Sequence, residues 1–218
     1  MAANDTAVDG AVDGAGNRPQ IYLISPPDFT LETFSGQLAR VLDQVETACV
    51  RLALAGSDED RIGRACDALR QIAHERDVAL VIENHIRLAE RHGLDGVHLS
   101  DGARHVRLAR KELGGDAIVG AFSGRSRHDG LTAGEAGADY VAFGPVGVSA
   151  LGLGEVVGRD LLAWWSEMIE VPVVCEGGLS VELIETLAPV TDFFGIGAEI
   201  WAADDPAKTL KELLAPLG

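Results

Sequence analysis

The stretch Gly137-Ala-Asp-Tyr-Val-Ala-Phe-Gly-Pro145 is the most informative part of this sequence for its fold. Gly137 suits the left-handed conformation in which many helices end. Residues 140–143 form a short apolar run of strand-forming side chains, as expected for a strand buried on both faces. Gly144-Pro145 then ends the strand and opens a loop. The stretch therefore predicts a helix, a strand and a loop of a parallel sheet.

The same pattern recurs along the chain and predicts the fold class. Strands are expected at residues 21–24, 49–52, 78–82, 96–99, 117–121, 140–143, 172–175 and 193–197. Apolar residues at helical spacing lie between them, and Ser57 is the expected N-cap of the second helix. Eight alternating units predict an α/β fold, a single (β/α)8 TIM barrel. The alternative is an open doubly wound sheet, which normally carries a glycine-rich loop where this chain has Ser25-Pro-Pro27.

The 218 residues are enough for one domain with a large core, and 47% of them are hydrophobic. Residues 1–18 are rich in Ala, Asp and Gly and contain little apolar surface. We therefore expect a disordered tail over 1–18 and the barrel over 19–218.

Charge and cysteine content narrow the class of partner. The formal net charge of −16 opposes nucleic-acid binding. No apolar run approaches the ~20 residues of a membrane span, and no secretory signal is visible. The 3 cysteines show no metal-binding spacing, which favours buried thiols and a cytoplasmic location. Both a monomer and a homo-oligomer remain open.

Glycine pairs follow the seventh and eighth expected strands, where (β/α)8 barrels often bind phosphate. The candidate phosphate-binding residues are Gly177, Gly178, Gly197 and Ala198. We expect backbone N–H groups near Gly178 and Ala198 to be free to bind an anion, so a phosphorylated small molecule is the expected substrate. The alternative is that these glycines only form turns.

Polar side chains after the other strands are candidates for the chemistry. The candidate catalytic residues are Glu83, Ser123, His128 and Glu176, and further pocket residues are Arg51, Asn84, Asp101 and Arg125. Carboxylates suit acid–base work or a hard cation, and Asp101 is the candidate ligand for Mg²⁺. No organic cofactor is expected. For each of these residues a hydrogen-bonded structural role is the alternative.

The sequence resembles the thiamine phosphate synthase and thiazole tautomerase superfamily. The matching stretches are Ile21-Tyr-Leu-Ile-Ser25, Asp95-Gly-Val-His-Leu99, Ile118-Val-Gly120, Gly137 to Pro145, and Pro172-Val-Val-Cys-Glu-Gly-Gly-Leu179. The resemblance implies a barrel that joins a pyrimidine methyl pyrophosphate to a thiazole phosphate. In such enzymes Mg²⁺ and basic side chains hold the pyrophosphate, which leaves before the thiazole nitrogen attacks.

Several positions depart from the pattern that this resemblance implies. Ala53 and Ala55 stand where Arg and Lys are usual, and Asn84 and Ala103 stand where carboxylates bind Mg²⁺. The loop 147–152 lacks the usual Lys. The glycines after strands seven and eight, together with Ser123, match the thiazole phosphate site.

Three functions follow from the resemblance and its departures. The first choice is a transferase of the thiamine phosphate synthase type with a degraded pyrophosphate and Mg²⁺ site. The second is an isomerase like the tautomerases, whose usual histidine after strand five aligns with Arg125, three residues before His128. The third is a phosphate-ligand-binding protein without catalysis.

Overall fold

The computed structural model describes residues 18–148 and 154–218, and it shows a closed parallel barrel. The strands are β1 (Gln20–Ile24), β2 (Cys49–Leu52), β3 (Ala79–Glu83), β4 (Gly96–Leu99), β5 (Ile118–Gly124), β6 (Tyr140–Phe143), β7 (Val173–Glu176) and β8 (Phe193–Ile196). Each strand pairs in parallel with the next, and β8 closes the ring against β1. The predicted single (β/α)8 barrel is confirmed, and the open sheet is excluded.

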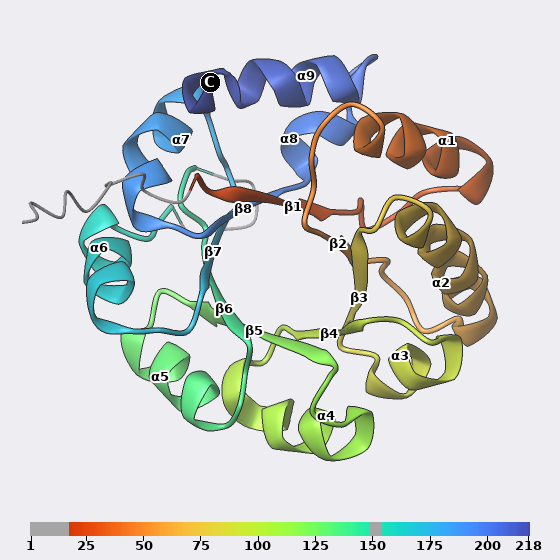
Figure 1. Cartoon of the computed structure of the whole chain (residues 1–218), viewed down its shortest axis with the longest axis horizontal. Helices are drawn as coiled ribbons and strands as arrows, with labels where there is room; N and C mark the ends of the chain where they lie inside the picture. Colours follow the sequence, from red (N-terminus) through yellow and green to blue (C-terminus); the bar gives the residue numbers. More distant parts are fainter. Residues whose placement is uncertain (1–17, 149–153) are drawn as a thin grey trace, which may run out of the picture.

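Helices surround the ring of strands on its outside (Figure 1). They are α1 (Leu31–Leu42), α2 (Glu59–His74), α3 (Ile86–His92), α4 (Val106–Leu113), α5 (Arg127–Glu135), α6 (Arg159–Met168), α7 (Val181–Leu187), α8 (Ala198–Trp201) and α9 (Pro206–Leu213). Short 3₁₀ turns are η1 (Gly102–His105), η2 (Ala188–Val190) and η3 (Ala215–Leu217). The short α8 lies inside the ring of helices, between β8 and α9 (Figure 1).

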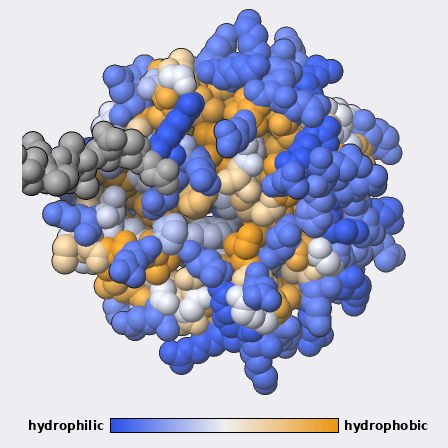
Figure 2. Space-filling view, in the orientation of Figure 1, coloured by the Kyte–Doolittle hydropathy of each residue, from blue (hydrophilic) through white to orange (hydrophobic). Residues whose placement is uncertain are grey.

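Side chains of alternate strand residues form two separate apolar clusters. The larger one packs the outward face of the strands against the helices, and it includes Leu23 and Trp165. The smaller one fills the barrel interior and includes Tyr22, Tyr140 and Val174. A charged outer surface covers these clusters, and Figure 2 shows hydrophilic residues around most of the rim of this face. Burial of both strand faces explains why the strands read as continuous apolar runs.

Close packing inside the barrel depends on glycine at two positions. A Cβ on Gly96 would lie 1.8 Å from the backbone oxygen of Ile118, and a Cβ on Gly120 would lie 2.0 Å from the ring of Tyr140. Neither separation is sterically possible, so these glycines let strands and a large aromatic ring share the narrow interior.

Most expected elements are present, with small differences at their ends. The N-cap of α2 is Asp58, whose side chain accepts a hydrogen bond from the Arg61 N–H, so the expectation of Ser57 was wrong by one residue. Strand β5 runs to Gly124, past the expected end at 121, with an irregular register near Ser123. Ser123 therefore belongs to the strand itself.

The expected tail and one expected loop fall mainly on residues whose structure is not described. Residues 1–17 and 149–153 lie outside the described part of the chain. Disorder over 1–18 therefore stays a prediction. The three cysteines are buried free thiols, as expected, and burial raises the pKa of Cys49 to about 12.

Candidate active site

A cavity of about 810 Å³ opens at the carboxyl ends of β1, β2, β3, β7 and β8. Its charged lining residues are Arg51, Glu83, Glu176, Glu199 and Asp28, and its apolar lining includes Ile24, Pro26, Phe29, Phe34 and Trp201. The predicted residues Gly177, Gly178, Gly197 and Ala198 also line it. We refer to it below as the mouth cavity. Its position is the one at which (β/α)8 barrels carry their active sites.

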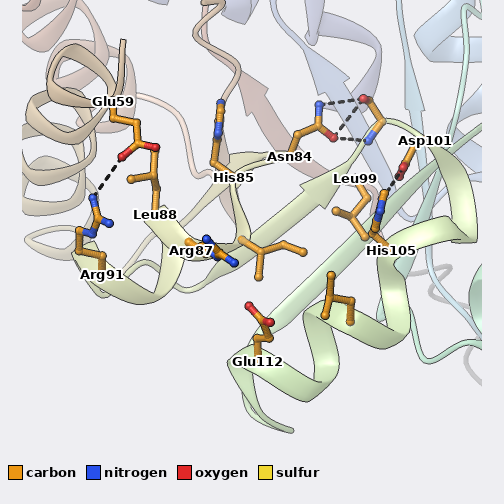
Figure 3. Close-up of a pocket in the computed structure, with 13 residues that line it drawn as sticks. Glu59, Asn84, His85, Arg87, Leu88, Arg91, Leu99, Asp101, His105 and Glu112 are labelled. Atoms are coloured by element: carbon orange, nitrogen blue, oxygen red, sulfur yellow. Dashed lines mark hydrogen bonds and ion pairs between the residues drawn. The ribbon is translucent and has the colours of Figure 1, made fainter. Parts of the chain in front are cut away.

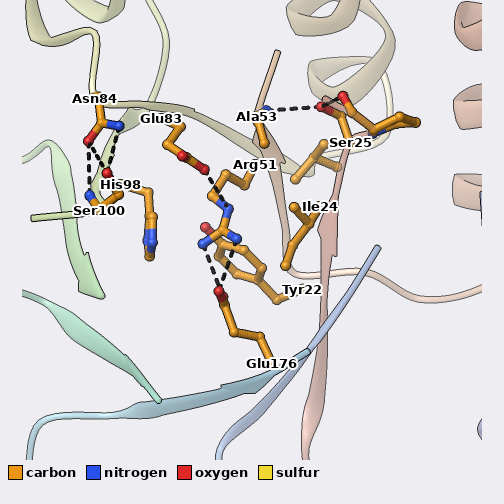
Figure 4. Close-up of polar contacts among 12 residues, drawn as sticks. Tyr22, Ile24, Ser25, Arg51, Ala53, Glu83, Asn84, His98, Ser100 and Glu176 are labelled. Atoms are coloured by element: carbon orange, nitrogen blue, oxygen red, sulfur yellow. Dashed lines mark hydrogen bonds and ion pairs between the residues drawn. The ribbon is translucent and has the colours of Figure 1, made fainter. Parts of the chain in front are cut away.

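Arg51 is the buried cation of the mouth cavity (Figure 4). Its two terminal nitrogens donate to the two carboxylate oxygens of Glu176, at 3.0 and 3.2 Å. Its Nε lies 3.6 Å from a carboxylate oxygen of Glu83 and has no hydrogen-bond partner within the described residues. Burial alone would lower the pKa of Arg51, but Glu176 together with Tyr22 and Tyr140 outweighs burial, and the pKa is raised. The guanidinium is thus permanently charged and already paired.

Below Arg51, a chain of hydrogen bonds crosses the barrel interior. The hydroxyls of Tyr22 and Tyr140 lie 2.6 Å apart, and the Tyr140 hydroxyl lies 2.9 Å from Nδ1 of His98. Burial, and next the charge of Arg51, lower the pKa of His98 well below its usual value. Burial also raises the pKa of both tyrosines. This chain therefore forms a neutral, hydrogen-bonded floor under the mouth cavity.

Three backbone N–H groups in the loops after β7 and β8 are bound by a carboxylate of the chain itself. Glu199 accepts hydrogen bonds through one oxygen from the N–H of Gly178 at 2.9 Å and of Leu179 at 3.2 Å. Its other oxygen accepts from the N–H of Gly197 at 2.8 Å. The expectation of a free Gly178 N–H was therefore wrong. The physical reason is that a carboxylate from α8 satisfies these donors itself.

Gly178 is fixed by its surroundings as well as by its backbone conformation. Its φ is +73°, and a Cβ there would lie 2.7 Å from the backbone carbon of Gly147. A bulky substitution at Gly178 would therefore disturb the β6–α6 loop as well as any bound anion, so phosphate binding is better tested at Glu199.

A second cavity of about 700 Å³ lies beside the carboxyl ends of β4 and β5 and is lined by Asp101, Ser123 and Arg125. The Ser123 hydroxyl is buried and has no hydrogen-bond partner among the residues described. Arg125 is exposed and forms an ion pair with Glu155. Ser123 and Arg125 thus line a different cavity from Arg51, Glu83 and Glu176.

A third cavity, of about 600 Å³, adjoins α3 and α4 and contains Asn84 and Asp101 (Figure 3). The amide of Asn84 is hydrogen-bonded to Ser100, with the Asn84 nitrogen 2.8 Å from the Ser100 hydroxyl. The Asp101 carboxylate lies 2.5 Å from Nδ1 of His105. Both side chains are thus held by protein partners.

Asp101, the candidate ligand for Mg²⁺, is already paired with a protein side chain in this structure. This ion favours one or two carboxylates with water and phosphate oxygens, but here the one carboxylate is paired with His105, and Ala103 supplies no side-chain oxygen. Over residues 18–148 and 154–218, no group of three or more His, Cys, Asp or Glu side chains is placed to hold a metal. The expectation of Mg²⁺ at Asp101 stays untested.

His128 lies apart from the cavities. It is exposed in the first turn of α5, and it lines neither the mouth cavity nor the cavity beside β5. His128 therefore belongs to a helix that lies outside the rim of these cavities. A role of His128 in catalysis stays a prediction that this geometry does not favour.

Two features of the site were not found from the sequence. One is Glu199, whose signal was only a carboxylate two residues after the glycine that follows β8. The other is the Tyr22–Tyr140–His98 chain, because the strand pattern does not show which side chains of distant strands meet. Across the described residues, no helix is long and apolar enough to cross a membrane.

Fold and site together define a (β/α)8 barrel whose candidate active site lies at the carboxyl ends of the strands. Residues 21–202 match the family model described as thiamine monophosphate synthase. The chain is 40% identical over 186 residues to the thiamine-phosphate synthase of Rhodospirillum centenum, a match that covers 84% of this chain and 89% of that protein. It is 37% identical over 195 residues to that of Erythrobacter litoralis, covering 86% and 91%.

This chain belongs to the thiamine monophosphate synthase family, and it is an enzyme of that transferase type. The solved thiamine phosphate pyrophosphorylase from Pyrococcus furiosus superposes with a TM-score of 0.76 at 25% identity, over 92% of this chain and 96% of that one. A 3-hexulose-6-phosphate synthase, at 17% identity and a TM-score of 0.65, shares the fold alone. The resemblance drawn from the sequence is confirmed at the level of the family.

Proposed function

We propose that this chain joins a pyrimidine methyl pyrophosphate to a thiazole in the mouth cavity, at low turnover. The observation that carries the proposal is the state of Arg51. It is the one Lys or Arg among the described residues that line this cavity, and its terminal nitrogens both bind Glu176. The cavity thus holds carboxylates where a cation forms but no free cation for a departing pyrophosphate.

The chemistry of the transfer explains why this matters. The bond from the pyrimidine methyl carbon to the pyrophosphate oxygen breaks, and the electron pair leaves with pyrophosphate. The thiazole nitrogen then supplies the electron pair of the new C–N bond, which leaves a cationic ring. Glu83, which forms no hydrogen bond with Arg51, stabilises the positive charge that develops on carbon and nitrogen. The leaving anion has no comparable partner, so its departure limits the rate.

The structure places the two residues, Ala53 and Ala55, that stand where basic side chains are usual. Ala53 lines the mouth cavity beyond the end of β2, and its N–H is held by the Ser25 hydroxyl at 2.9 Å. Ala55 is exposed, and its N–H donates to the Pro27 carbonyl at 2.8 Å. This loop is held to the β1 loop at both positions, so basic side chains introduced there have a fixed backbone.

A second candidate is isomerisation of a thiazole carboxylate ligand, as in the tautomerases. It is favoured by the two carboxylates, Glu83 from β3 and Glu176 from β7, that line one cavity. Such a reaction needs groups that take and return a proton, and no pyrophosphate site.

The test is steady-state turnover of the pyrimidine pyrophosphate, with added Mg²⁺, using a hydroxyalkylthiazole and its phosphate ester as acceptors. We expect wild-type turnover far below the median for enzymes of about 10 s⁻¹. The double variant Ala53→Arg/Ala55→Lys should gain at least about tenfold, since one preorganised donor is typically worth about 10²–10³ in rate. Glu185→Lys, on the exposed side of α7, adds the same charge away from the cavity and should gain nothing.

Two results would contradict the proposal. Wild-type turnover near 10 s⁻¹ would show that pyrophosphate departure is already supported. Absence of turnover in the wild type and in the double variant, with proton exchange into a thiazole carboxylate, would favour the isomerase instead.

A further inference from the structure

The charge of this chain is distributed unevenly around the barrel. Residues 59–113, from α2 to α4, contain 10 of the 18 Lys and Arg residues and 10 of the 34 Asp and Glu residues, so this sector has no net formal charge. The rest of the chain carries the whole formal charge of −16. The three helices follow one another along one side of the ring (Figure 1). Two copies of the chain therefore repel each other least where these sectors meet.

An exposed leucine lies on the outer surface of this sector. Leu108 of α4 is 42% exposed. It lines the cavity of about 600 Å³ that adjoins α3 and α4, and Ile86, Leu88 and Leu99 line the same cavity (Figure 3). An apolar side chain of a second molecule placed on Leu108 would thus lie next to further apolar side chains.

Charged residues flank Leu108 at equal spacing on its two sides. Arg104 in η1 precedes it by four residues and Glu112 follows it by four, and all three residues are exposed. Because η1 runs directly into α4, residues at this spacing lie along one side of the helix. Arg104 and Glu112 are about 12 Å apart along the axis, which is too far for them to pair within one chain.

Over residues 18–148 and 154–218, neither Arg104 nor Glu112 forms an ion pair. The ion pairs of this region involve other side chains and join Asp101 to His105, Arg91 to Glu59, and Arg110 to Asp139. The Arg104 guanidinium and the Glu112 carboxylate are thus both available to a second molecule.

This arrangement of side chains is complementary to itself. When two copies of α4 lie antiparallel about a two-fold axis at Leu108, the two leucine side chains meet, and each Arg104 lies opposite Glu112 of the other copy. Lys111 then lies opposite the hydrogen-bonded Asp101 and His105 of the other copy, so its charge also faces a carboxylate.

Two other exposed apolar side chains lack this complementarity. Met168 on α6 lies between Glu167 and Glu170 in the sequence, and Val181 at the start of α7 precedes Glu182. A two-fold contact centred on Met168 or Val181 would bring carboxylates of the two copies together, which opposes association.

We propose that two copies of this chain form a two-fold symmetric dimer through antiparallel α4 helices, with Leu108 at its centre and Arg104 paired with Glu112 across the interface. In Figure 1, α4 lies on the opposite side of the ring from α8 and α9. The mouth cavity opens at the carboxyl ends of the strands, so this contact leaves it uncovered. The dimer is therefore independent of the reaction in that cavity.

Sedimentation velocity of the full chain over a range of protein concentrations tests the proposal. We expect a monomer–dimer equilibrium for the wild type. Arg104→Glu and Glu112→Arg should each raise the dissociation constant of the dimer at least about tenfold, because each places like charges opposite each other twice in a symmetric interface. The double variant Arg104→Glu/Glu112→Arg should restore the affinity of the wild type, since opposite charges then face each other again.

Leu108→Glu should also weaken the dimer, and Met168→Glu is the matched control, because it makes the same kind of change at an exposed apolar residue of α6. Its dissociation constant should equal that of the wild type. Arg104 and Glu112 are exposed, so their variants guard against a folding defect in Leu108→Glu. The proposal fails if the wild type is monomeric at every concentration, if Met168→Glu weakens the dimer as much as Leu108→Glu, or if the double variant binds no more tightly than the single charge variants.

Discussion

Arg51 shows how a single buried charge determines both the order and the electrostatics of the cavity. An arginine that is 6% exposed would be costly without partners. Glu176 supplies a bidentate pair and Glu83 a further charge, so the side chain is fixed at the centre of the site. The same pairing neutralises the positive charge of Arg51. The ion pair that stabilises the buried side chain thus leaves it little charge with which to bind an anion.

The field of Arg51 also reaches His98 and leads to a prediction at the same scale. Burial and Arg51 lower the pKa of His98 in the folded chain, whereas an unfolded histidine titrates near pH 6.5. Below about pH 6.5 the unfolded chain therefore binds a proton that the folded chain does not. The free energy of unfolding should fall as the pH falls below this value, by up to about 1.4 kcal/mol per pH unit from this residue. His98→Gln should show a shallower fall.

Urea unfolding at a series of pH values between about 5 and 7.5 measures this slope. His128→Gln, at an exposed position of α5, is the control and should keep the slope of the wild type. An unchanged slope in His98→Gln would show that the buried histidine is not the titrating group.

At the scale of the elements, the space between neighbouring strands limits which side chains the barrel can hold. β4 and β6 contain 4 residues each, and their neighbours approach so closely that Gly96 and Gly120 cannot carry a Cβ where they stand. The space at Gly120 is taken by Tyr140, whose hydroxyl is bonded to Tyr22 and lies beside His98. The packing of β5 against β6 and the hydrogen bonds of the polar floor thus both depend on the position of the Tyr140 ring.

Gly120→Ala should therefore destabilise the barrel. The added methyl would displace the Tyr140 ring, and the ring cannot move without breaking its hydrogen bonds to Tyr22 and His98. We expect the free energy of unfolding to fall by about 1–3 kcal/mol or more, as for other overpacked cores. Gly36→Ala in α1 is the matched control, because a Cβ there meets nothing within 4 Å. Its helix propensity should instead add up to about 1 kcal/mol, and urea unfolding of both variants distinguishes the two cases. Equal stabilities would contradict the packing argument.

For the whole molecule, the sequence predicted the barrel and the end of the barrel that carries the site. Apolar runs that end in glycine located the strands, and Glu83 and Glu176 are indeed the last residues of β3 and β7. It did not predict contacts between distant segments. Tyr22 and Tyr140 are separated by 118 positions, and their contact depends on the closed ring. Nor can residue type decide whether Ser57 or Asp58 caps α2, since both are good N-caps.

The charge of the whole chain acts on every anionic ligand that approaches the mouth cavity. The formal net charge is −16, and the cavity itself carries more carboxylates than cations among its described residues. Such a field repels a pyrophosphate over distances that the ionic strength determines. Salt weakens electrostatic repulsion over tens of ångströms much more than over a few ångströms. The long-range effect of the net charge can therefore be separated from the local effect of the Glu199 carboxylate.

The affinity for the pyrimidine pyrophosphate should therefore rise with salt. Between about 10 mM and 150 mM KCl the screening length falls from about 30 Å to about 8 Å, and removal of the repulsion should strengthen binding by up to about tenfold. Calorimetry without added divalent ions measures the effect, and the uncharged hydroxyalkylthiazole is the control, with an affinity that should stay constant. A site governed by a free cation would behave in the opposite way, since salt would weaken its attraction for pyrophosphate. A fall in affinity with salt would thus show that Arg51 is released from Glu176 when the ligand binds, and that the net charge of the chain does not control the approach.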